Sequence, residues 1–194
     1  MKRVSLTLVL LGTLLGFSGA AAAEPGCIPT RGDYLGPFYI SGTTEGEELN
    51  RRGRPGEPLL VTGRVLSAAA GHSALAGARV EVWQTDGAGN YYPEGSGDAA
   101  DYAPEELDLR GTLTTDGSGR YRFNTVVPGS YFPRPRHFHF RLSAVDHKPL
   151  VTQLYITGDG SLQQPGGNCR HAPLIKTADG YLYESPDIYL QPVE

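Results

Sequence analysis

Residues 137–144 read HFHFRLSA, a stretch in which polar and apolar side chains alternate. In a β-strand, residues two apart point to the same side of the sheet. His137 and His139 would therefore share one face with Arg141, while the aromatic residues between them would pack into a core on the other face. The stretch predicts a strand that is apolar on one side and polar on the other.

Similar short runs, rich in β-branched and aromatic residues, surround this strand and are separated by turns containing Gly and Asp. Their spacing leaves no room for crossover helices, which favours an all-β, antiparallel β-sandwich with few helical turns. Only residues 98–110, DAADYAPEELDLR, look able to form a helical turn or two. The other runs read LLVTGRVL, ARVEVWQT, GTLTT, RYRFNTV and VTQLYIT.

The chain of 194 residues is long enough for one compact domain. Residues 1–23 hold a short basic start, an apolar run and small residues at the end, which predicts a cleaved signal peptide. Residues 24–58 are rich in chain breakers and predict an irregular N-terminal arm that lies over a sheet. The sandwich core is expected at 59–160, with a C-terminal tail at 161–194 that packs on it.

Removal of the leader would also remove Lys2 and Arg3 and change the formal charge from −4 to −6. Nothing basic then favours nucleic acid, and no later stretch is long and apolar enough to span a membrane. We therefore expect an exported protein, periplasmic or secreted. In an oxidising compartment, Cys27 and Cys169 would form a disulfide between the arm and the tail, with two buried free thiols as the alternative.

Two seven-residue stretches repeat the pattern Thr-Asp-Gly-x-Gly-x-Tyr: residues 85–91, TDGAGNY, and residues 115–121, TDGSGRY. Each predicts a tight turn that leads into a strand, with glycine where a positive φ is needed. Tyr121 then begins an alternating run and is most simply structural. A special role for Tyr91 therefore needs separate grounds.

A His-x-His pair is on its own a weak metal signal, because the second face of a sandwich is often simply wet. Here Pro133 and Pro135 stiffen the approach to the pair, and Tyr131 lies close enough upstream to fold back onto the same face. No Cys, Asp or Glu is close in sequence, so further nearby ligands would have to be tyrosinates. Phenolate with imidazole suits ferric iron better than zinc, magnesium or calcium.

Several stretches then match one known pattern. VEVWQTDGAGNYY contains Trp-x-x-x-x-x-Gly-x-Tyr, and PGSY is followed by RPRHFHF, an Arg-Pro-x-His-x-His segment. TQLYITGD follows these, and GPFY precedes them in the arm. In this order they resemble the intradiol ring-cleavage dioxygenases, the catechol 1,2- and protocatechuate 3,4-dioxygenase type, over residues 35 to about 160.

The resemblance implies a metal centre that holds Fe(III) and a defined chemistry. Tyr131 would be the ligand that substrate displaces, Arg134 would stabilise charge on the substrate ring, and Gln153 would line the pocket. The implied reaction uses O2 to cleave a catechol-type aromatic diol between its two hydroxyl-bearing carbons, giving a cis,cis-muconate-type diacid. A homo-oligomer is a further possibility. The implied iron ligands are Tyr91, Tyr131, His137 and His139.

Two other interpretations remain open. The repeated turns and GARVEVW also suit a non-catalytic, transthyretin-like or carboxypeptidase-regulatory-like binding module, which would carry no iron. The histidine pair could instead form a copper or zinc site with His147 or His171. In every case Trp83 is expected to be buried in the core.

Overall fold

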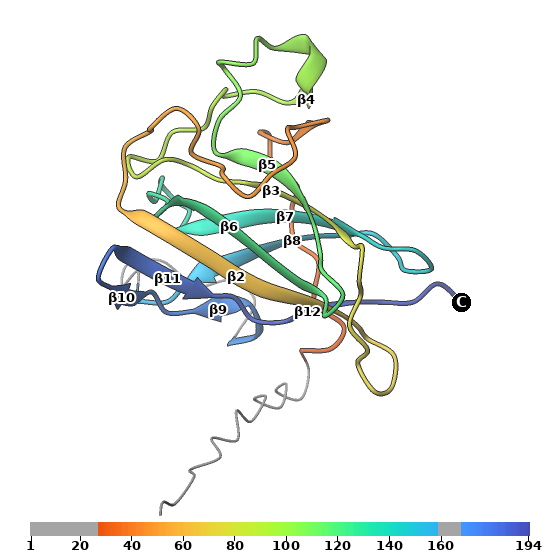
Figure 1. The fold of residues 1–194 in the computed structure, drawn as a ribbon. Coiled ribbons are helices and arrows are strands. Elements are labelled where there is room, and N and C mark those ends of the chain that lie inside the picture. The colour runs from red at the N-terminus through yellow and green to blue at the C-terminus, as the bar shows by residue number, and fades with distance from the viewer. Residues whose placement is uncertain (1–26, 159–167) are drawn as a thin grey trace, which may run out of the picture.

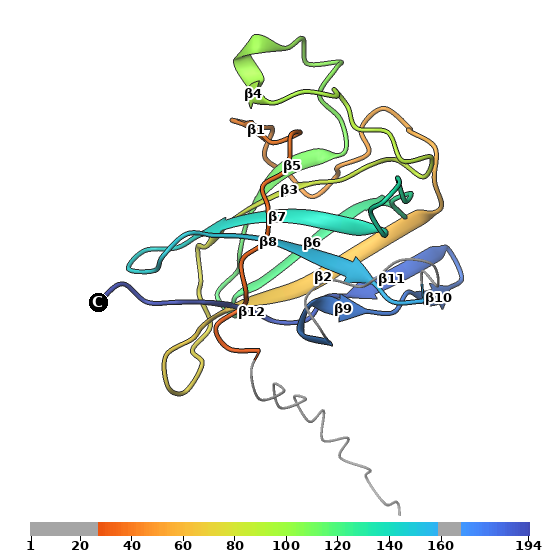
Figure 2. The same cartoon turned by 180° about the vertical axis from the view of Figure 1, so that it is seen from behind.

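The computed structural model describes residues 27–158 and 168–194, so the predicted signal peptide lies outside the described residues. Two five-stranded sheets, seen from opposite sides in Figure 1 and Figure 2, enclose one hydrophobic core. The prediction of an all-β sandwich is confirmed. Among the described residues, no helix is long and apolar enough to cross a membrane.

One sheet is built around the long strand β2 (Pro58–Ser67). β2 pairs antiparallel with β6 (Arg120–Val126), and both strands correspond to runs predicted from the sequence. It also pairs in parallel with β11 (Gly180–Glu184) and β12 (Ile188–Leu190), and β10 (Ile175–Thr177) extends the sheet beyond β11. The C-terminal segment thus supplies strands of the sandwich itself.

The second sheet has the order β5-β3-β7-β8-β9 and contains the HFHFRLSA strand at its centre. All pairs are antiparallel except the last, in which β8 and β9 run in parallel. The strands are β5 (Arg110–Thr114), β3 (Arg79–Trp83), β7 (His137–Ser143), β8 (Leu150–Ile156) and β9 (His171–Ala172).

Short elements complete the described chain. β1 (Ile40–Ser41) pairs in parallel with β4 (Gly97–Asp98), which leads into the 3-10 turn η1 (Ala99–Asp101). Asp98 caps η1 through its side chain, as acidic residues at a helix start commonly do. The expected helical turn in residues 98–110 is therefore present, and a second one forms at η2 (Asn168–Arg170).

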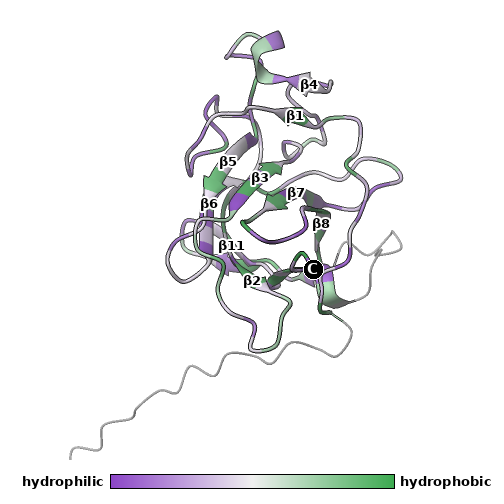
Figure 3. Ribbon diagram, turned by 90° about the vertical axis from the view of Figure 1, so that its right-hand side faces the viewer, coloured by the Kyte–Doolittle hydropathy of each residue, from purple (hydrophilic) through white to green (hydrophobic). Residues whose placement is uncertain are grey.

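The alternation along β7 decides which side of the second sheet faces the core. Phe138, Phe140 and Leu142 are fully buried in the cluster between the sheets, where Phe140 contacts the rings of Tyr121 and Phe123. The strands accordingly change between hydrophobic and hydrophilic colours along their length (Figure 3). The two histidines point to the opposite side, as predicted.

The N-terminal arm covers that opposite side, crossing β8, β7 and β3 in Figure 2. Its backbone is attached to the sheet where the amide of Asp33 donates to the carbonyl of Val151 at 2.9 Å. The expected disulfide is confirmed: Cys27 and Cys169 are bonded, with their Cα atoms 5.3 Å apart. The arm is therefore fixed at its start to the segment that precedes β9.

The two repeated sequences form the same turn. In the first, the Asp86 amide donates to the Asn90 carbonyl, and Gly89 has a φ of 94°. In the second, Asp116 and Gly119 play the same parts, with a φ of 73° at the glycine. The turns are equivalent, so their final tyrosines differ only in what surrounds them.

Replacing Phe140 by Ala should lower the free energy of unfolding by about 3–5 kcal/mol, because it leaves a cavity among the core aromatics. Val145→Ala is the matched control, since that side chain is 85% exposed, and should change the value by less than about 0.5 kcal/mol. Urea denaturation of both variants measures the difference. Equal, small losses for both would contradict the assignment of Phe140 to the core.

Candidate metal centre

His137 and His139 lie side by side on β7, and each is only 2% exposed. The face that holds them is therefore not the wet side of a strand. Their Nε2 atoms approach to 3.0 Å. His137 Nδ1 lies 2.6 Å from the carbonyl oxygen of Pro135, which can only accept, so this nitrogen carries the proton and Nε2 presents a lone pair.

His139 has no tautomer that satisfies both of its ring nitrogens. Its buried Nδ1 has no hydrogen-bond partner among the described residues. With the proton on Nδ1, two Nε2 lone pairs would face each other at 3.0 Å; with the proton on Nε2, the Nδ1 lone pair is left buried without a donor. A cation between the two Nε2 atoms would remove the first conflict.

Two phenols complete this cluster. The hydroxyl oxygen of Tyr91 lies 3.5 Å from His137 Nε2 and 3.4 Å from the hydroxyl oxygen of Tyr131. Tyr91 is buried at the end of the first repeated turn, whereas Tyr131 is only half-buried and follows the PGS turn. Tyr121, which holds the position of Tyr91 in the second repeated turn, instead lies in the core, with its hydroxyl 2.8 Å from Ser185 Oγ. Four donor atoms thus converge from β7 and two loops.

Burial keeps both imidazoles and the Tyr91 phenol neutral in the absence of a metal. It lowers the pKa of His137 to about 4, assisted by the charge of Arg134, and lowers the pKa of His139 well below its ordinary value. Burial, followed by the neighbouring Tyr131, raises the pKa of Tyr91 well above its ordinary value. The imidazoles are therefore in their metal-binding form at neutral pH, while ionisation of Tyr91 requires a strong cation.

Arg134 and Gln153 lie next to this cluster. The Gln153 residue pairs with His139 across β7 and β8, and its side-chain oxygen accepts a hydrogen bond from Arg134. Arg134 also donates to the hydroxyl of Tyr155 at 3.3 Å. The structure thus brings all six residues named from the sequence into one region.

Other contacts here were not foreseen from the sequence. Trp83 is buried, but on the histidine side of the sheet, where it stacks on His139 with ring centroids 4.8 Å apart. Phe38 of the arm stacks on Tyr91 at 4.3 Å. At Gly36, a Cβ atom would come within 3.2 Å of the His139 ring, so this glycine lets the arm lie directly on the histidine.

The buried Arg110 holds the Tyr91 region in place. Its three guanidinium nitrogens donate to the carbonyls of Tyr92, Phe38 and Pro93, at 2.7, 2.8 and 3.1 Å. It therefore joins the chain just after Tyr91 to the arm residue that stacks on Tyr91. Burial lowers the pKa of Arg110 to about 10, which still leaves it charged at neutral pH. In the sequence it appears only as one arginine at the start of a strand.

Neither alternative metal set is assembled. Within residues 27–158 and 168–194, no group of three or more His, Cys, Asp or Glu side chains is placed to hold a metal. His147 contacts Ser67 and the carbonyl of Val145, while His171 stacks on Tyr155. The donors that meet the histidine pair are phenols.

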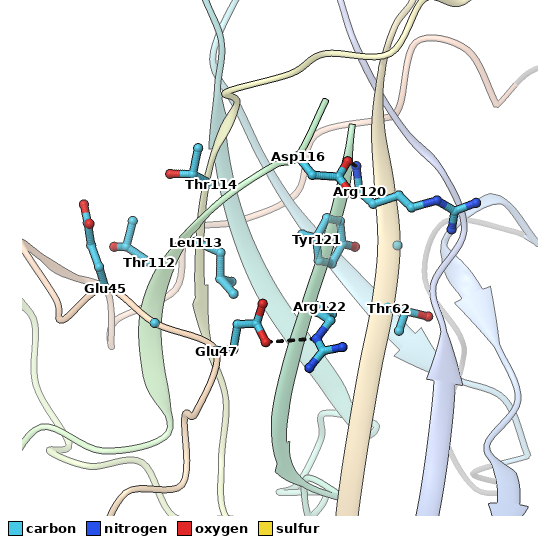
Figure 4. A pocket seen from close by; sticks show the side chains of 12 residues that line it. Glu45, Glu47, Thr62, Thr112, Leu113, Thr114, Asp116, Arg120, Tyr121 and Arg122 are labelled. Carbon is cyan, nitrogen blue, oxygen red and sulfur yellow. Dashed lines mark hydrogen bonds and ion pairs between the residues drawn. The ribbon is translucent and has the colours of Figure 1, made fainter. Parts of the chain in front are cut away.

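A cavity of about 560 Å³ lies elsewhere, lined by residues of β2, β5 and β6 and by residues 45–47 of the arm (Figure 4). Its lining includes Thr62, Thr112 and the exposed ion pair of Glu47 with Arg122, but no histidine and none of the six predicted site residues. This cavity is separate from the metal centre.

Comparison with known proteins shows the family to which the chain belongs. A family model described as dioxygenase matches residues 35–182. The chain belongs to the intradiol dioxygenase family. It is 41% identical over 119 residues to the protocatechuate 3,4-dioxygenase beta chain of Burkholderia cepacia, covering 56% of this chain and 49% of that protein. It is 31% identical over 180 residues to 6-chlorohydroxyquinol 1,2-dioxygenase of Cupriavidus pinatubonensis, covering 78% and 60%.

Among solved structures, this family member is similar to the dioxygenase domain of a dioxygenase carbohydrate-binding protein fusion from the cellulolytic bacterium Streptomyces sp. SirexAA-E. The two share 26% identity with a TM-score of 0.67, and the match covers 85% of this chain and 99% of that one. By contrast, the chain spans only about half to three-fifths of the length of the curated relatives named above.

The lowered histidine pKa values predict how the stability of the metal-free protein depends on pH. Because the folded pKa of His137 is about 4 and the unfolded value is about 6.5, only the unfolded chain takes up a proton as the pH falls through this window. The free energy of unfolding should therefore fall between pH 6.5 and pH 4, by about 3 kcal/mol from this residue.

Urea denaturation of chelator-treated protein at several pH values measures this slope. His137→Gln should remove much of it, and His72→Gln, outside the cluster, should retain it. Equal slopes for wild type and His137→Gln would contradict the burial of a neutral imidazole at this position.

Proposed function

We propose that this chain is an exported, ferric-iron dioxygenase that cleaves a catechol-type ring between its two hydroxyl-bearing carbons. Both atoms of O2 enter the product, a cis,cis-muconate-type diacid. The observation that carries the proposal is the convergence of two imidazole and two phenol groups beside Arg134, in a member of the intradiol dioxygenase family.

The residues fit a hard, highly charged cation. His137 and His139 would contribute neutral nitrogen lone pairs, and Tyr91 and Tyr131 would contribute phenolate oxygens. Bound Fe(III) would supply the positive charge that ionises these phenols and holds the diol as its dianion. Two features support this donor set over a zinc or calcium site: the unsatisfied ring of His139, and the absence of a carboxylate or thiolate ligand from the cluster among the described residues.

Tyr91 and Tyr131 would have different roles in the reaction because they differ in exposure. Tyr91 is buried, stacked by Phe38 and held through Arg110, so it would remain in place during the reaction. Tyr131 is half-buried, so the diol can reach it, and its phenolate oxygen would take up one of the two diol protons. Arg134 would stabilise negative charge on the ring, and Gln153 would fix the position of Arg134.

Export is supported by two features. The N-terminal leader has the composition of a signal peptide, and the Cys27–Cys169 disulfide suits an oxidising compartment. A small aromatic diol and O2 would then be the partners of the mature protein. A homo-oligomer remains part of the proposal without a contact that carries it.

The binding-module interpretation is less well supported. Such a module gives no reason for burying two imidazoles and a phenol against one another, because each buried polar group costs free energy unless it is satisfied. The two repeated turns, which favoured the module, are accounted for here as equivalent strand connections with different surroundings.

The direct test is cleavage of catechol by the iron-loaded mature protein, followed as O2 consumption together with formation of the muconate product. Tyr91→Phe should lower the rate by at least about a hundredfold, because it removes an oxygen that holds the metal. Tyr121→Phe is the matched control, since it changes the same position of the twin turn, and should retain activity. Absence of cleavage by wild type, or equal rates for wild type and Tyr91→Phe, would contradict the proposal.

A further inference from the structure

A line of polar contacts leads from the disulfide to Arg134. Asp33 in the arm is the central member: its Oδ2 accepts from Arg170 at 2.5 Å and from the hydroxyl of Tyr155 at 2.9 Å. Its Oδ1 accepts from the amide of Tyr34 at 2.8 Å, and its own amide donates to β8. The carboxylate is thus held at its backbone and at both oxygens.

Arg170 is held in an unusual place for a cation. It directly follows Cys169, and its side chain is only 5% exposed. Its guanidinium carbon lies 5.5 Å from the centre of the Tyr155 ring, and Asp33 supplies the carboxylate with which it pairs. A buried arginine needs such a partner, so Arg170 and Asp33 fix each other. Both belong to segments that Cys27 and Cys169 tie together.

The hydroxyl of Tyr155 connects the Asp33–Arg170 pair to Arg134, which lies beside the candidate metal centre. A phenol has one proton, and two acceptors lie within reach of it: the Asp33 carboxylate at 2.9 Å and the Gln153 side-chain oxygen at 3.0 Å. The charged carboxylate is the stronger acceptor, so the proton points toward Asp33. The oxygen lone pairs are then available to Arg134, whose NH2 group lies 3.3 Å away. Burial and the charge of Asp33 raise the pKa of Tyr155, which keeps this hydroxyl protonated.

We propose that Asp33 and Arg170, held by the Cys27–Cys169 disulfide, are positioning residues that orient Arg134 through Tyr155. The inference rests on the proposed function, because it assigns Arg134 to stabilising charge on the substrate ring. In this chain the tail therefore acts on the reaction as well as on the fold. The hydrogen bonds of this line end on none of the four metal-donor side chains, although the Tyr155 ring lies against that of His137 with centroids 5.9 Å apart.

The kinetic consequence follows from where Arg134 acts. A misplaced arginine loses an interaction that is strongest when charge develops on the ring, so kcat falls while KM changes little. A residue with a merely structural role would lower the melting temperature and leave kcat of the folded protein unchanged.

The test compares iron-loaded variants of the mature protein in catechol cleavage. Tyr155→Phe removes only the connecting hydroxyl and keeps the Asp33–Arg170 pair. It should lower kcat roughly tenfold, with KM within about twofold of wild type and the visible spectrum unchanged. Asp33→Asn should lower kcat at least as much, and Arg170→Lys, which keeps the charge, should be less affected than Arg170→Met.

Asp187→Asn is the matched control. Asp187 binds Arg64 through two hydrogen bonds of 2.9 and 2.5 Å beside the other sheet, so its loss breaks a comparable ion pair outside the metal centre. Its melting temperature should fall and its kcat should not change. The double variant Cys27→Ser with Cys169→Ser should show the kcat loss in milder form. Serine variants are needed because a thiol reductant would also reduce ferric iron.

Wild-type kcat in folded, iron-loaded Tyr155→Phe and Asp33→Asn would overturn the inference while leaving the proposed function intact. A fall in kcat of the same size in Asp187→Asn would also overturn it. If wild type neither retains iron nor cleaves catechol, the proposed function fails and this inference fails with it.

Discussion

The close approach of two imidazole nitrogens, 3.0 Å apart on a buried strand face, is the constraint on which the other features of the site depend. The backbone of β7 requires this proximity, because His137 and His139 point the same way and the carbonyl of Pro135 fixes one ring. Neither tautomer of His139 satisfies both of its ring nitrogens: one leaves two lone pairs facing each other, and the other leaves the buried Nδ1 without a partner. Burial also disfavours the charged form of both rings. An unfavourable cluster of this kind is retained where a ligand compensates for it, and a cation does so directly.

The burial itself comes from the N-terminal arm. The arm forms little regular structure, yet it lies across the histidine face, with Gly36 against His139 and Phe38 against Tyr91. Its ordering costs conformational entropy, which the disulfide at Cys27 and the carbonyl contacts of Arg110 help to offset. The same arm carries Asp33, so the segment that covers the candidate metal centre would also support Arg134.

The sequence alone was sufficient for six strands, because period-2 alternation and glycine turns are local signals; these are β2, β3, β5, β6, β7 and β8. It treated residues 161–194 as a tail and did not predict the strands β9 to β12. It also separated the core face of β7 from the histidine face. It could not show that the histidine face is buried, since the arm has no periodic pattern and its position depends on tertiary contacts. The parallel pairing of β11 and β12 with β2, and the three carbonyls that surround Arg110, have the same long-range origin. For the candidate metal centre, the resemblance to the intradiol dioxygenases named the six residues, whereas residue types and spacing alone left several interpretations open. The distances between the six residues required the structure.

The most direct test of the central claim is the visible absorption spectrum of the purified mature protein, measured with its iron content and repeated after anaerobic addition of catechol. We expect about one iron per chain and a tyrosinate-to-iron charge-transfer band, which would shift when catechol displaces Tyr131 and return when air is admitted. A protein that stays colourless and metal-free after reconstitution with ferric iron would contradict this expectation. His137, His139, Tyr91 and Tyr131 would then be a buried polar cluster without a metal.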